Sequence, residues 1–163
     1  MARETRTYSP DKVSLIISGY VVSGILEIGI EFNSDAFVMQ RGIRGQNTRI
    51  YNPDSSARLT IEVLQTSPTN DILFQIVKQD KVTKSARLDL VLSDLSGHTI
   101  IQSDSAYVTN YPNMRLSTGF NPRVWTFDVL RITDSNLTGG TTGPDSIFSD
   151  AGNRLVSAIT GLF

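Results

Sequence analysis

Apolar residues recur at every second position along several short stretches of this chain, and this spacing constrains the fold more than any other feature. It is clearest in residues 12–18, 57–65, 87–93 and 123–133. Successive side chains of a strand point to opposite faces, so a period of two predicts strands with one buried face. The chain is therefore predicted to be mainly β, with antiparallel strands.

Three further features belong to the same β pattern. Residues 26–32 alternate apolar side chains with Glu and Gly, which predicts another strand. The apolar stretch that follows residues 12–18 is interrupted by Gly19, Gly24 and Gly29. These glycines predict bends or close approach of the backbone. Residues 106–110 are expected to form one more short strand.

A single helix is predicted over residues 68–79. Ser67 followed by Pro68 is a typical helix start, because Ser accepts from the first N–H groups and Pro fits the first turn. Apolar residues at positions i, i+1, i+4 and i+5 form a stripe that can cover a sheet. These residues are Ile72, Leu73, Ile76 and Val77.

Residues 37–40 are predicted to form a strand that leads into a long polar loop. This loop, residues 41–56, is rich in Arg, Gly and Asn. The loop matches neither the dinucleotide-binding nor the phosphate-binding glycine motif. The chain has 15 basic and 16 acidic residues, so it lacks the basic surplus typical of nucleic-acid-binding proteins. We expect a contact with a neighbouring subunit, with nucleic-acid binding as the alternative. The residues assigned to this contact are Arg41, Arg44, Gln46, Asn47, Arg49 and Tyr51.

Carboxylates alternate with apolar residues on the predicted strands, so several are expected to share the polar face of one sheet. Two interpretations stand beside each other: a solvated outer face, and the acidic lining of a channel. A glycosidase-type carboxylate pair is a third, which no aromatic-rich cleft supports. The residues assigned to the lining are Glu27, Glu31, Glu62 and Asp89, with Asp128 on the same face.

The composition points away from an enzyme. The chain has no Cys, which excludes disulfides and thiolate chemistry. His98 is the only histidine and falls in a predicted turn, so neither a zinc site nor a Ser-His-Asp triad has its partners. We expect no cofactor and no metal. No apolar run approaches the roughly 20 residues of a membrane helix, and the start has no signal-peptide pattern, so we expect a soluble domain with no membrane partner.

The 163 residues are expected to form a single domain, 1–163, with a β core at 10–132. Residues 134–163 are expected to comprise a flexible connector and a C-terminal segment, since 134–144 is rich in Gly and Thr and ends in Pro. Within that segment, 150–159 is predicted as a short helix that docks on a partner.

The order of these elements resembles that of the tail tube proteins of contractile-tailed bacteriophages. The likeness covers most of residues 10–132 and is most specific over residues 50–80, which include the run Leu-Gln-Thr-Ser-Pro-Thr-Asn-Asp-Ile-Leu at 64–73. The related inner-tube proteins of bacterial contractile injection systems share this organisation. The resemblance implies an antiparallel β-sandwich or split barrel with one flanking helix, whose sheets join into a continuous barrel in a hexameric ring.

The same resemblance implies a function and partners. Rings would stack into a hollow virion tail tube, assembled in the host cytoplasm, through which DNA passes without specific binding. The implied partners are further copies of the chain, the tail sheath protein, the baseplate and tail-terminator proteins, and the tape-measure protein. In such proteins the long loop generally contacts an adjacent ring, which here assigns residues 41–56 to that contact.

Two other functions fit the residues. One is the inner tube of a bacterial secretion or injection system, which carries proteins instead of DNA. The other is a monomeric β-sandwich binding module, such as a carbohydrate-binding domain. That module would need an exposed aromatic platform, whereas Trp125 and Phe127 lie on an apolar strand face and are expected in the core.

Overall fold

A computed structural model describes residues 8–137 of the chain. A short 3-10 turn (Pro10–Lys12) leads into the first strand, and one helix, α1 (Thr69–Thr83), follows the sixth. The strands are β1 (Val13–Ile17), β2 (Tyr20–Val21), β3 (Ile25–Phe32), β4 (Phe37–Arg41), β5 (Asn47–Tyr51), β6 (Ala57–Val63), β7 (Leu88–Asp94), β8 (Thr99–Val108), β9 (Arg123–Arg131) and β10 (Asp134–Asn136).

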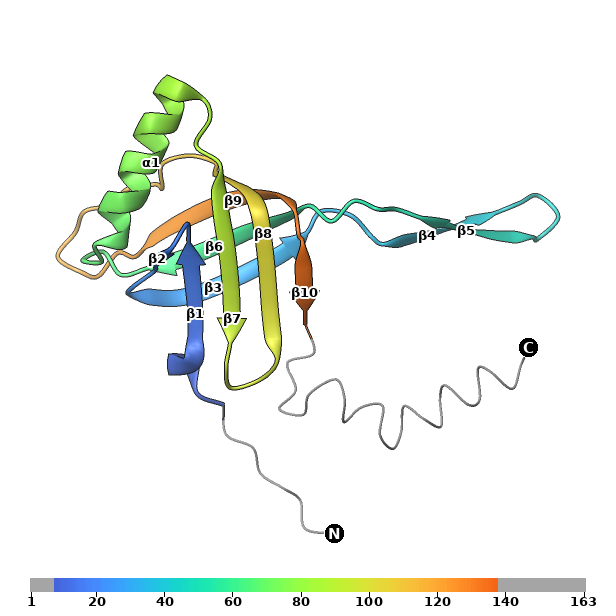
Figure 1. Cartoon of the computed structure of the whole chain (residues 1–163), viewed down its shortest axis with the longest axis horizontal. Coiled ribbons are helices and arrows are strands. Elements are labelled where there is room, and N and C mark those ends of the chain that lie inside the picture. The colour runs from blue at the N-terminus through green and yellow to red at the C-terminus, as the bar shows by residue number, and fades with distance from the viewer. Residues whose placement is uncertain (1–7, 138–163) are drawn as a thin grey trace, which may run out of the picture.

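Eight strands form one antiparallel sheet in the order β2-β1-β7-β8-β9-β6-β3, with β10 pairing with β8. The sheet curls, so that β1 and β7 run across the direction of β3 and β6 (Figure 1). The prediction of a mainly β, antiparallel fold with one helix is confirmed. The predicted sandwich or split barrel is not found: the main sheet is a single curled sheet. Among the described residues β3 pairs only with β6, so this sheet does not close into a barrel.

The predicted alternation places the core on one face of this sheet. In the centre, β9 pairs with β6 so that Phe127 lies opposite Leu59 and Trp125 opposite Ile61, and all four side chains are buried. Burying an aliphatic or aromatic side chain contributes about 1.5–3 kcal/mol relative to leaving it exposed. The central strands therefore supply much of the driving force for folding. Trp125 and Phe127 are in the core, as predicted.

The helix α1 covers this apolar face (Figure 1). Leu73 and Val77 of the predicted stripe are buried, and Ile76 packs against the core from its edge. The predicted cap lies one residue too early, because the helix begins at Thr69 with Pro68 as its N-cap. The hydroxyl of Ser67 still accepts a hydrogen bond from the N–H of Thr69 at 3.2 Å. The helix continues four residues beyond its predicted end at 79 and stops where Lys84 adopts a left-handed conformation, φ 55.

Two other boundaries differ from the predictions. Residues 106–108 are not a separate strand, because they continue β8 past a bulge at 105–106. Residues 134–136, expected to begin a flexible connector, form β10 and pair with residues 100–102 of β8. The helix predicted at 150–159 lies outside the described residues.

Gly24 makes the tight bend that brings the start of β3 against the start of α1. Its φ is +70, and a Cβ there would lie 2.9 Å from the Cβ of Ser67. Its carbonyl accepts from the N–H of Leu64 at 2.8 Å, so the close approach is held by a hydrogen bond. Both the left-handed conformation and the lack of space require glycine.

We therefore expect Gly24→Ala to destabilise the domain by roughly 1–3 kcal/mol, the cost of a strained backbone position. Gly29→Ala is the matched control, because Gly29 lies in β3 and an added Cβ there meets nothing within 4 Å. Its effect should stay within about 0.5 kcal/mol. Urea unfolding of both variants measures the difference, and equal midpoints would contradict this account of the bend.

Candidate assembly surfaces

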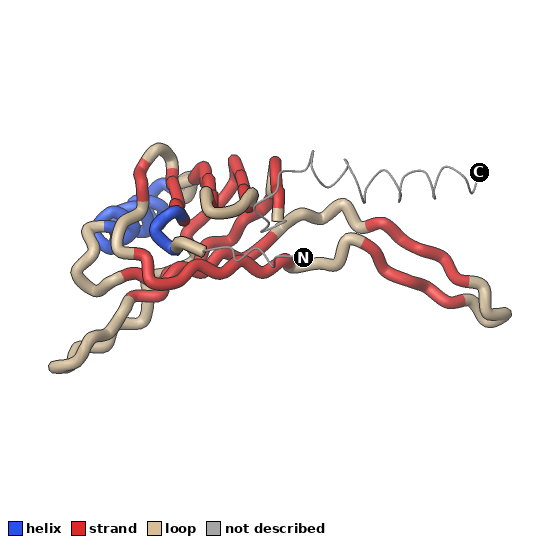
Figure 2. The backbone as a smooth tube through the Cα atoms, turned by 90° about the horizontal axis from the view of Figure 1, so that it is seen from below, coloured by secondary structure: helices blue, strands red, loops and turns tan. Residues whose placement is uncertain are grey.

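The predicted loop at 41–56 is largely a β-hairpin that extends away from the curled sheet (Figures 1 and 2). β4 and β5 pair in register from Phe37 opposite Tyr51 to Arg41 opposite Asn47, and they form a sheet of their own. The prediction of an irregular loop is wrong for this part. The strand predicted over residues 37–40 is confirmed as β4, and β5 is the strand that the sequence did not indicate. Every residue of β5 is exposed and its apolar residues are few, so no buried face marks it as a strand.

The predicted contact residues are distributed along the whole hairpin. Four lie on the strands and two in the turn between them. Those on the strands are Arg41, Asn47, Arg49 and Tyr51, and those in the turn are Arg44 and Gln46. The turn is closed by hydrogen bonds from the N–H of Gly42 to the carbonyl of Gln46, at 2.7 Å, and from the N–H of Gly45 to the carbonyl of Gly42, at 3.0 Å.

The two faces of the hairpin differ in chemistry. On one face the rings of Phe37 and Tyr51 lie 5.4 Å apart, and the guanidinium of Arg49 lies 3.6 Å above the Phe37 ring. On the other face Val38 lies opposite Ile50, and both are about half exposed. An isolated two-stranded hairpin is marginally stable in water. Apolar side chains on both faces of such an element favour contact with another molecule.

A network of polar side chains fixes the base of the hairpin. The carboxylate of Asp54 accepts hydrogen bonds from the hydroxyl of Ser34 at 2.8 Å, and from the N–H and hydroxyl of Ser56 at 3.0 and 3.1 Å. The side chain of Asn33 donates to the same Ser56 hydroxyl at 3.0 Å. Both chain segments that enter the hairpin are therefore tied together where they leave the sheet.

Three of the predicted lining residues come together on the outer face of β3 and β6. Glu27 lies directly opposite Glu62, and Glu31 lies opposite Arg58. Arg58 in turn lies opposite Asp128 of β9, and its Nε is 3.4 Å from a carboxylate oxygen of that residue. We call Glu27, Glu31 and Glu62 the acidic strip.

Asp89 is not part of this strip. It lies on β7, and β8 and β9 separate that strand from β6. Its N–H donates to the hydroxyl of Ser18 at 3.1 Å. The other ion pair near that part of the sheet joins Arg131 to Asp104 at 2.6 Å, and this hydrogen bond holds the pKa of Asp104 below its usual value.

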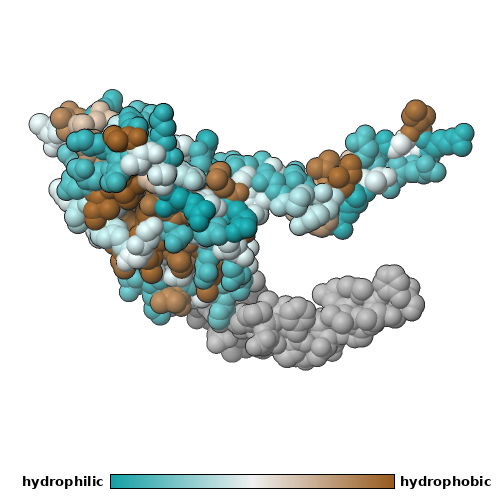
Figure 3. All heavy atoms as spheres, turned by 45° about the horizontal axis from the view of Figure 1, so that its top comes forward, coloured by the Kyte–Doolittle hydropathy of each residue, from teal (hydrophilic) through white to brown (hydrophobic). Residues whose placement is uncertain are grey.

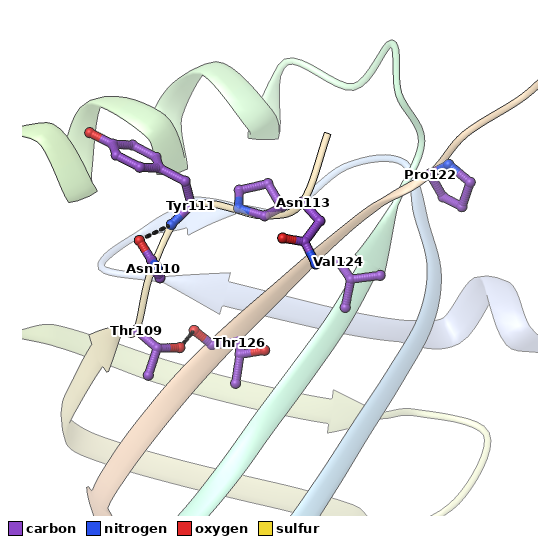
Figure 4. A pocket seen from close by; sticks show the side chains of 8 residues that line it. Thr109, Asn110, Tyr111, Asn113, Pro122, Val124 and Thr126 are labelled. Carbon is purple, nitrogen blue, oxygen red and sulfur yellow. Dashed lines mark hydrogen bonds between the residues drawn. The ribbon is translucent and has the colours of Figure 1, made fainter. Parts of the chain in front are cut away.

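The connection between β8 and β9, residues 109–122, carries the feature that sequence reasoning missed. It is flanked by two open pockets, one of about 290 Å³ against the outer face of β9 (Figure 4) and one of about 180 Å³ beneath α1. In the first, the hydroxyl of Thr109 donates to the carbonyl of Thr126 at 2.5 Å. Met114, Leu116 and Phe120 are exposed on the connection. The sequence signal that could have indicated this surface is the presence of apolar residues in a loop that contains Pro and Asn.

Among residues 8–137 no group of three or more His, Cys, Asp and Glu side chains is placed to hold a metal ion. In the same part of the chain, no helix is long and apolar enough to cross a membrane. The features that stand out are surfaces: the hairpin, the acidic strip and the 109–122 connection.

The fold defined by this sheet, helix and hairpin is that of proteins from contractile injection machines. The chain is similar to a subunit of the anti-feeding prophage cap, the tube-terminating cap, with a TM-score of 0.61 over 83% of this chain and 96% of that one, at 11% identity. It is similar to a chain of the sheath-tube complex of an extracellular contractile injection system, with a TM-score of 0.58 over 80% and 93%, at 11% identity.

The sequence itself is similar to a viral protein. It is 29% identical to the structural protein ORF10 of Pseudomonas phage KPP10, over 98% of this chain and 91% of that protein. No protein-family model matches the chain. These similarities confirm the predicted resemblance to structural proteins of phages and contractile injection systems.

The network at the base of the hairpin gives a prediction with a defined sign. The pKa of Asp54 is below its usual value of 3.8, first because the Ser56 N–H donates to it and then because of the Ser34 and Ser56 hydroxyls. A carboxyl group with a lowered folded-state pKa stabilises above its unfolded-state pKa and loses that effect as the pH falls through the folded-state value. We expect Asp54→Ala to lower the amide protection factors of β4 and β5, which are exchange rates normalised to those of an unstructured chain at the same pH. Acidification of the unsubstituted protein below 3.8 should lower the same protection factors, because the carboxylate is then protonated.

Asp35→Ala is the control, since Asp35 is an exposed carboxylate at the same end of the hairpin. Exchange in β4 and β5 should be unchanged in this variant. If Asp54→Ala also left exchange unchanged, the carboxylate would not be what orders the base.

Proposed function

We propose that this chain is a structural subunit of a contractile phage tail that builds the tail tube. One observation carries the proposal: a hairpin exposed on both faces extends from a core with the fold of tube-complex and cap subunits. The similarity to a phage structural protein over nearly the whole chain supports the viral context.

In this proposal the subunits form hexameric rings that stack head-to-tail. Free sheet edges such as β3 would pair with neighbouring subunits, which satisfies backbone groups that otherwise invite aggregation. Heterologous contacts between rings propagate into a filament. The hairpin would make the contact between rings, through Arg41, Arg44, Gln46, Asn47, Arg49 and Tyr51. Sheath, baseplate, terminator and tape-measure proteins would complete a virion tail assembled in the host cytoplasm.

The acidic strip would face the lumen, and Asp89 would contribute to the same lining if the ring brings β7 toward the axis. Negative side chains repel phosphates, so DNA would pass during ejection without binding. Each phosphate that a wall neutralised would instead add salt-dependent affinity.

The first experiment is negative-stain electron microscopy of the purified chain at high concentration. Hollow tubes with six-fold end views are expected. Single rings that do not stack would favour the second candidate, a tube-terminating subunit, to which the similarity with the anti-feeding prophage cap points. Monodisperse particles under every condition would favour a monomeric binding module. A protein-conducting injection tube is distinguished by its genomic neighbours, secretion ATPase genes instead of capsid and terminase genes.

We expect the double substitution Arg44→Glu with Arg49→Glu to block tube polymerisation while the subunit stays folded. Both side chains are exposed, so the substitution leaves the core intact. Arg44→Lys with Arg49→Lys is the matched control that keeps both positive charges. Circular dichroism reports the fold and microscopy reports assembly. Normal tubes from the double Glu variant would contradict the role of the hairpin arginines.

The lumen assignment gives a separate prediction. Tubes of a Glu27→Lys, Glu62→Lys variant should retain DNA that threads or abuts the lumen, and the retention should fall steeply with salt. Tubes of a Glu27→Gln, Glu62→Gln control should not gain this binding to the same extent. Co-sedimentation with double-stranded DNA across a salt series measures both. Equal binding by the two variants would place the acidic strip away from the lumen.

A further inference from the structure

The pocket beneath α1 is built from three parts of the chain. The first turn of the helix, the residues just after β8 and the start of β9 meet there, and the pocket holds about 180 Å³. A cavity of about 150 Å³ is enough to bind benzene in an apolar protein interior. Its lining is Asn70, Asp71, Phe74, Tyr111, Pro112, Met114, Arg123 and Trp125.

This pocket is held open by fixed contacts. The indole N–H of Trp125 donates to the Asn70 side chain at 2.9 Å. The rings of Phe74 and Tyr111 lie 5.0 Å apart, and the ammonium of Lys81 lies 4.1 Å above the Tyr111 ring. A pocket whose walls are already positioned loses little conformational freedom when it is filled.

The 109–122 connection is fixed in the same way. The guanidinium of Arg123 donates to the carbonyls of Arg115 and Asn121, at 3.5 and 3.4 Å, and the side chain of Asn121 donates to the hydroxyl of Ser117 at 2.7 Å. Met114 of this connection is 70% exposed at the pocket. An ordered, exposed apolar rim is typical of an interaction site.

The tip of the hairpin presents the complementary group. Ile43 is fully exposed in the turn, with Arg44 next to it. Apolar surface is visible at the far end of the hairpin among hydrophilic atoms (Figure 3). The left-handed φ of Gly45, +84, and the two hydrogen bonds of the turn hold this residue at the tip. A branched apolar side chain beside a cation matches a pocket that has Phe74 and Met114 in its wall and one carboxylate, Asp71, in its lining. Arg123 also lines the pocket, and its guanidinium is directed to the carbonyls of Arg115 and Asn121.

The hairpin and the pocket cannot meet within one chain. The hairpin extends from one end of the molecule, whereas the 109–122 connection and α1 lie at the opposite end (Figures 1 and 2). Two complementary surfaces at opposite ends of one molecule define a heterologous contact that propagates from copy to copy. The occupant that this geometry favours is therefore a second copy of the chain.

We infer that the hairpin tip of one copy inserts Ile43 into the pocket beneath α1 of the next copy, where Arg44 pairs with Asp71. The inference rests on the proposed stacking of rings and names the receptor that the stacking contact uses. The apolar insertion provides affinity, and the ion pair at the pocket edge fixes orientation.

Cysteine cross-linking tests this contact directly, because the chain contains no cysteine of its own. A variant with Ile43→Cys and Met114→Cys should form a disulfide between copies on mild oxidation. Each copy carries one donor and one receptor, so non-reducing electrophoresis should show a ladder of covalent oligomers, not only dimers. Ile43→Cys with Val82→Cys is the matched control, because Val82 is 81% exposed on α1 outside this pocket.

A charge exchange provides an independent readout. Arg44→Glu and Asp71→Arg should each raise the critical concentration for assembly at least tenfold. The combination of both substitutions should restore the critical concentration of the unsubstituted chain. The receptor assignment would be overturned if the Ile43→Cys, Met114→Cys variant formed tubes without a ladder and the charge exchange gave no rescue. The proposed tube function would be unaffected by that result. Failure of the unsubstituted chain to form rings or tubes would overturn both. A ladder equal in the Val82→Cys control would show random collision and would also overturn the assignment.

Discussion

The indole of Trp125 connects the parts on which the other surfaces depend. Its ring is buried near the start of β9, while its N–H donates to the side-chain oxygen of Asn70 at 2.9 Å. The amide nitrogen of Asn70 donates in turn to the carbonyls of Leu64 and Ser67, at 2.9 and 3.2 Å. The end of β6, the start of α1 and the start of β9 are thereby held in one arrangement. An unpaired indole or amide here would cost about 1–3 kcal/mol, so the geometry is strongly specified.

The sequence predicts a strand most clearly where one face of the strand is buried. Leu59, Ile61 and Val63 alternate with polar residues because β6 has one face in the core, and the period is visible without a structure. The hairpin has no such face. Its first strand is still predicted, over residues 37–40, because that segment is rich in apolar residues. In β5 the two apolar residues, Ile50 and Tyr51, lie on opposite faces beside polar ones, and this pattern resembles that of a polar loop. Whether the sheet stays open, and where three segments meet to form a pocket, depends on tertiary geometry. The spacing of apolar residues along the sequence does not predict either feature.

The exposed hairpin gives no stability to the core of a monomeric protein. Its strands bury none of their residues, so their order comes from their own ladder, the ring contact between Phe37 and Tyr51, and the hydrogen bonds of Asp54 at the base. An exposed ribbon with apolar side chains is an aggregation hazard unless another surface covers it. Such a ribbon is useful only if its exposure is temporary, which is the situation of a subunit before assembly.

The acidic strip supports the same view from electrostatics. Like charges directly opposite each other destabilise an antiparallel pair, and Glu27 faces Glu62. At the other end of the strip Arg58 lies between Glu31 and Asp128, which offsets the negative charge there. A face shaped only by monomer stability would place opposite charges at both ends. If the acidic strip faces the lumen of stacked rings, each ring would contribute one band of negative charge, and nearly neutral bands would separate these. The phosphates of DNA would then be repelled once per ring and attracted nowhere along the strip.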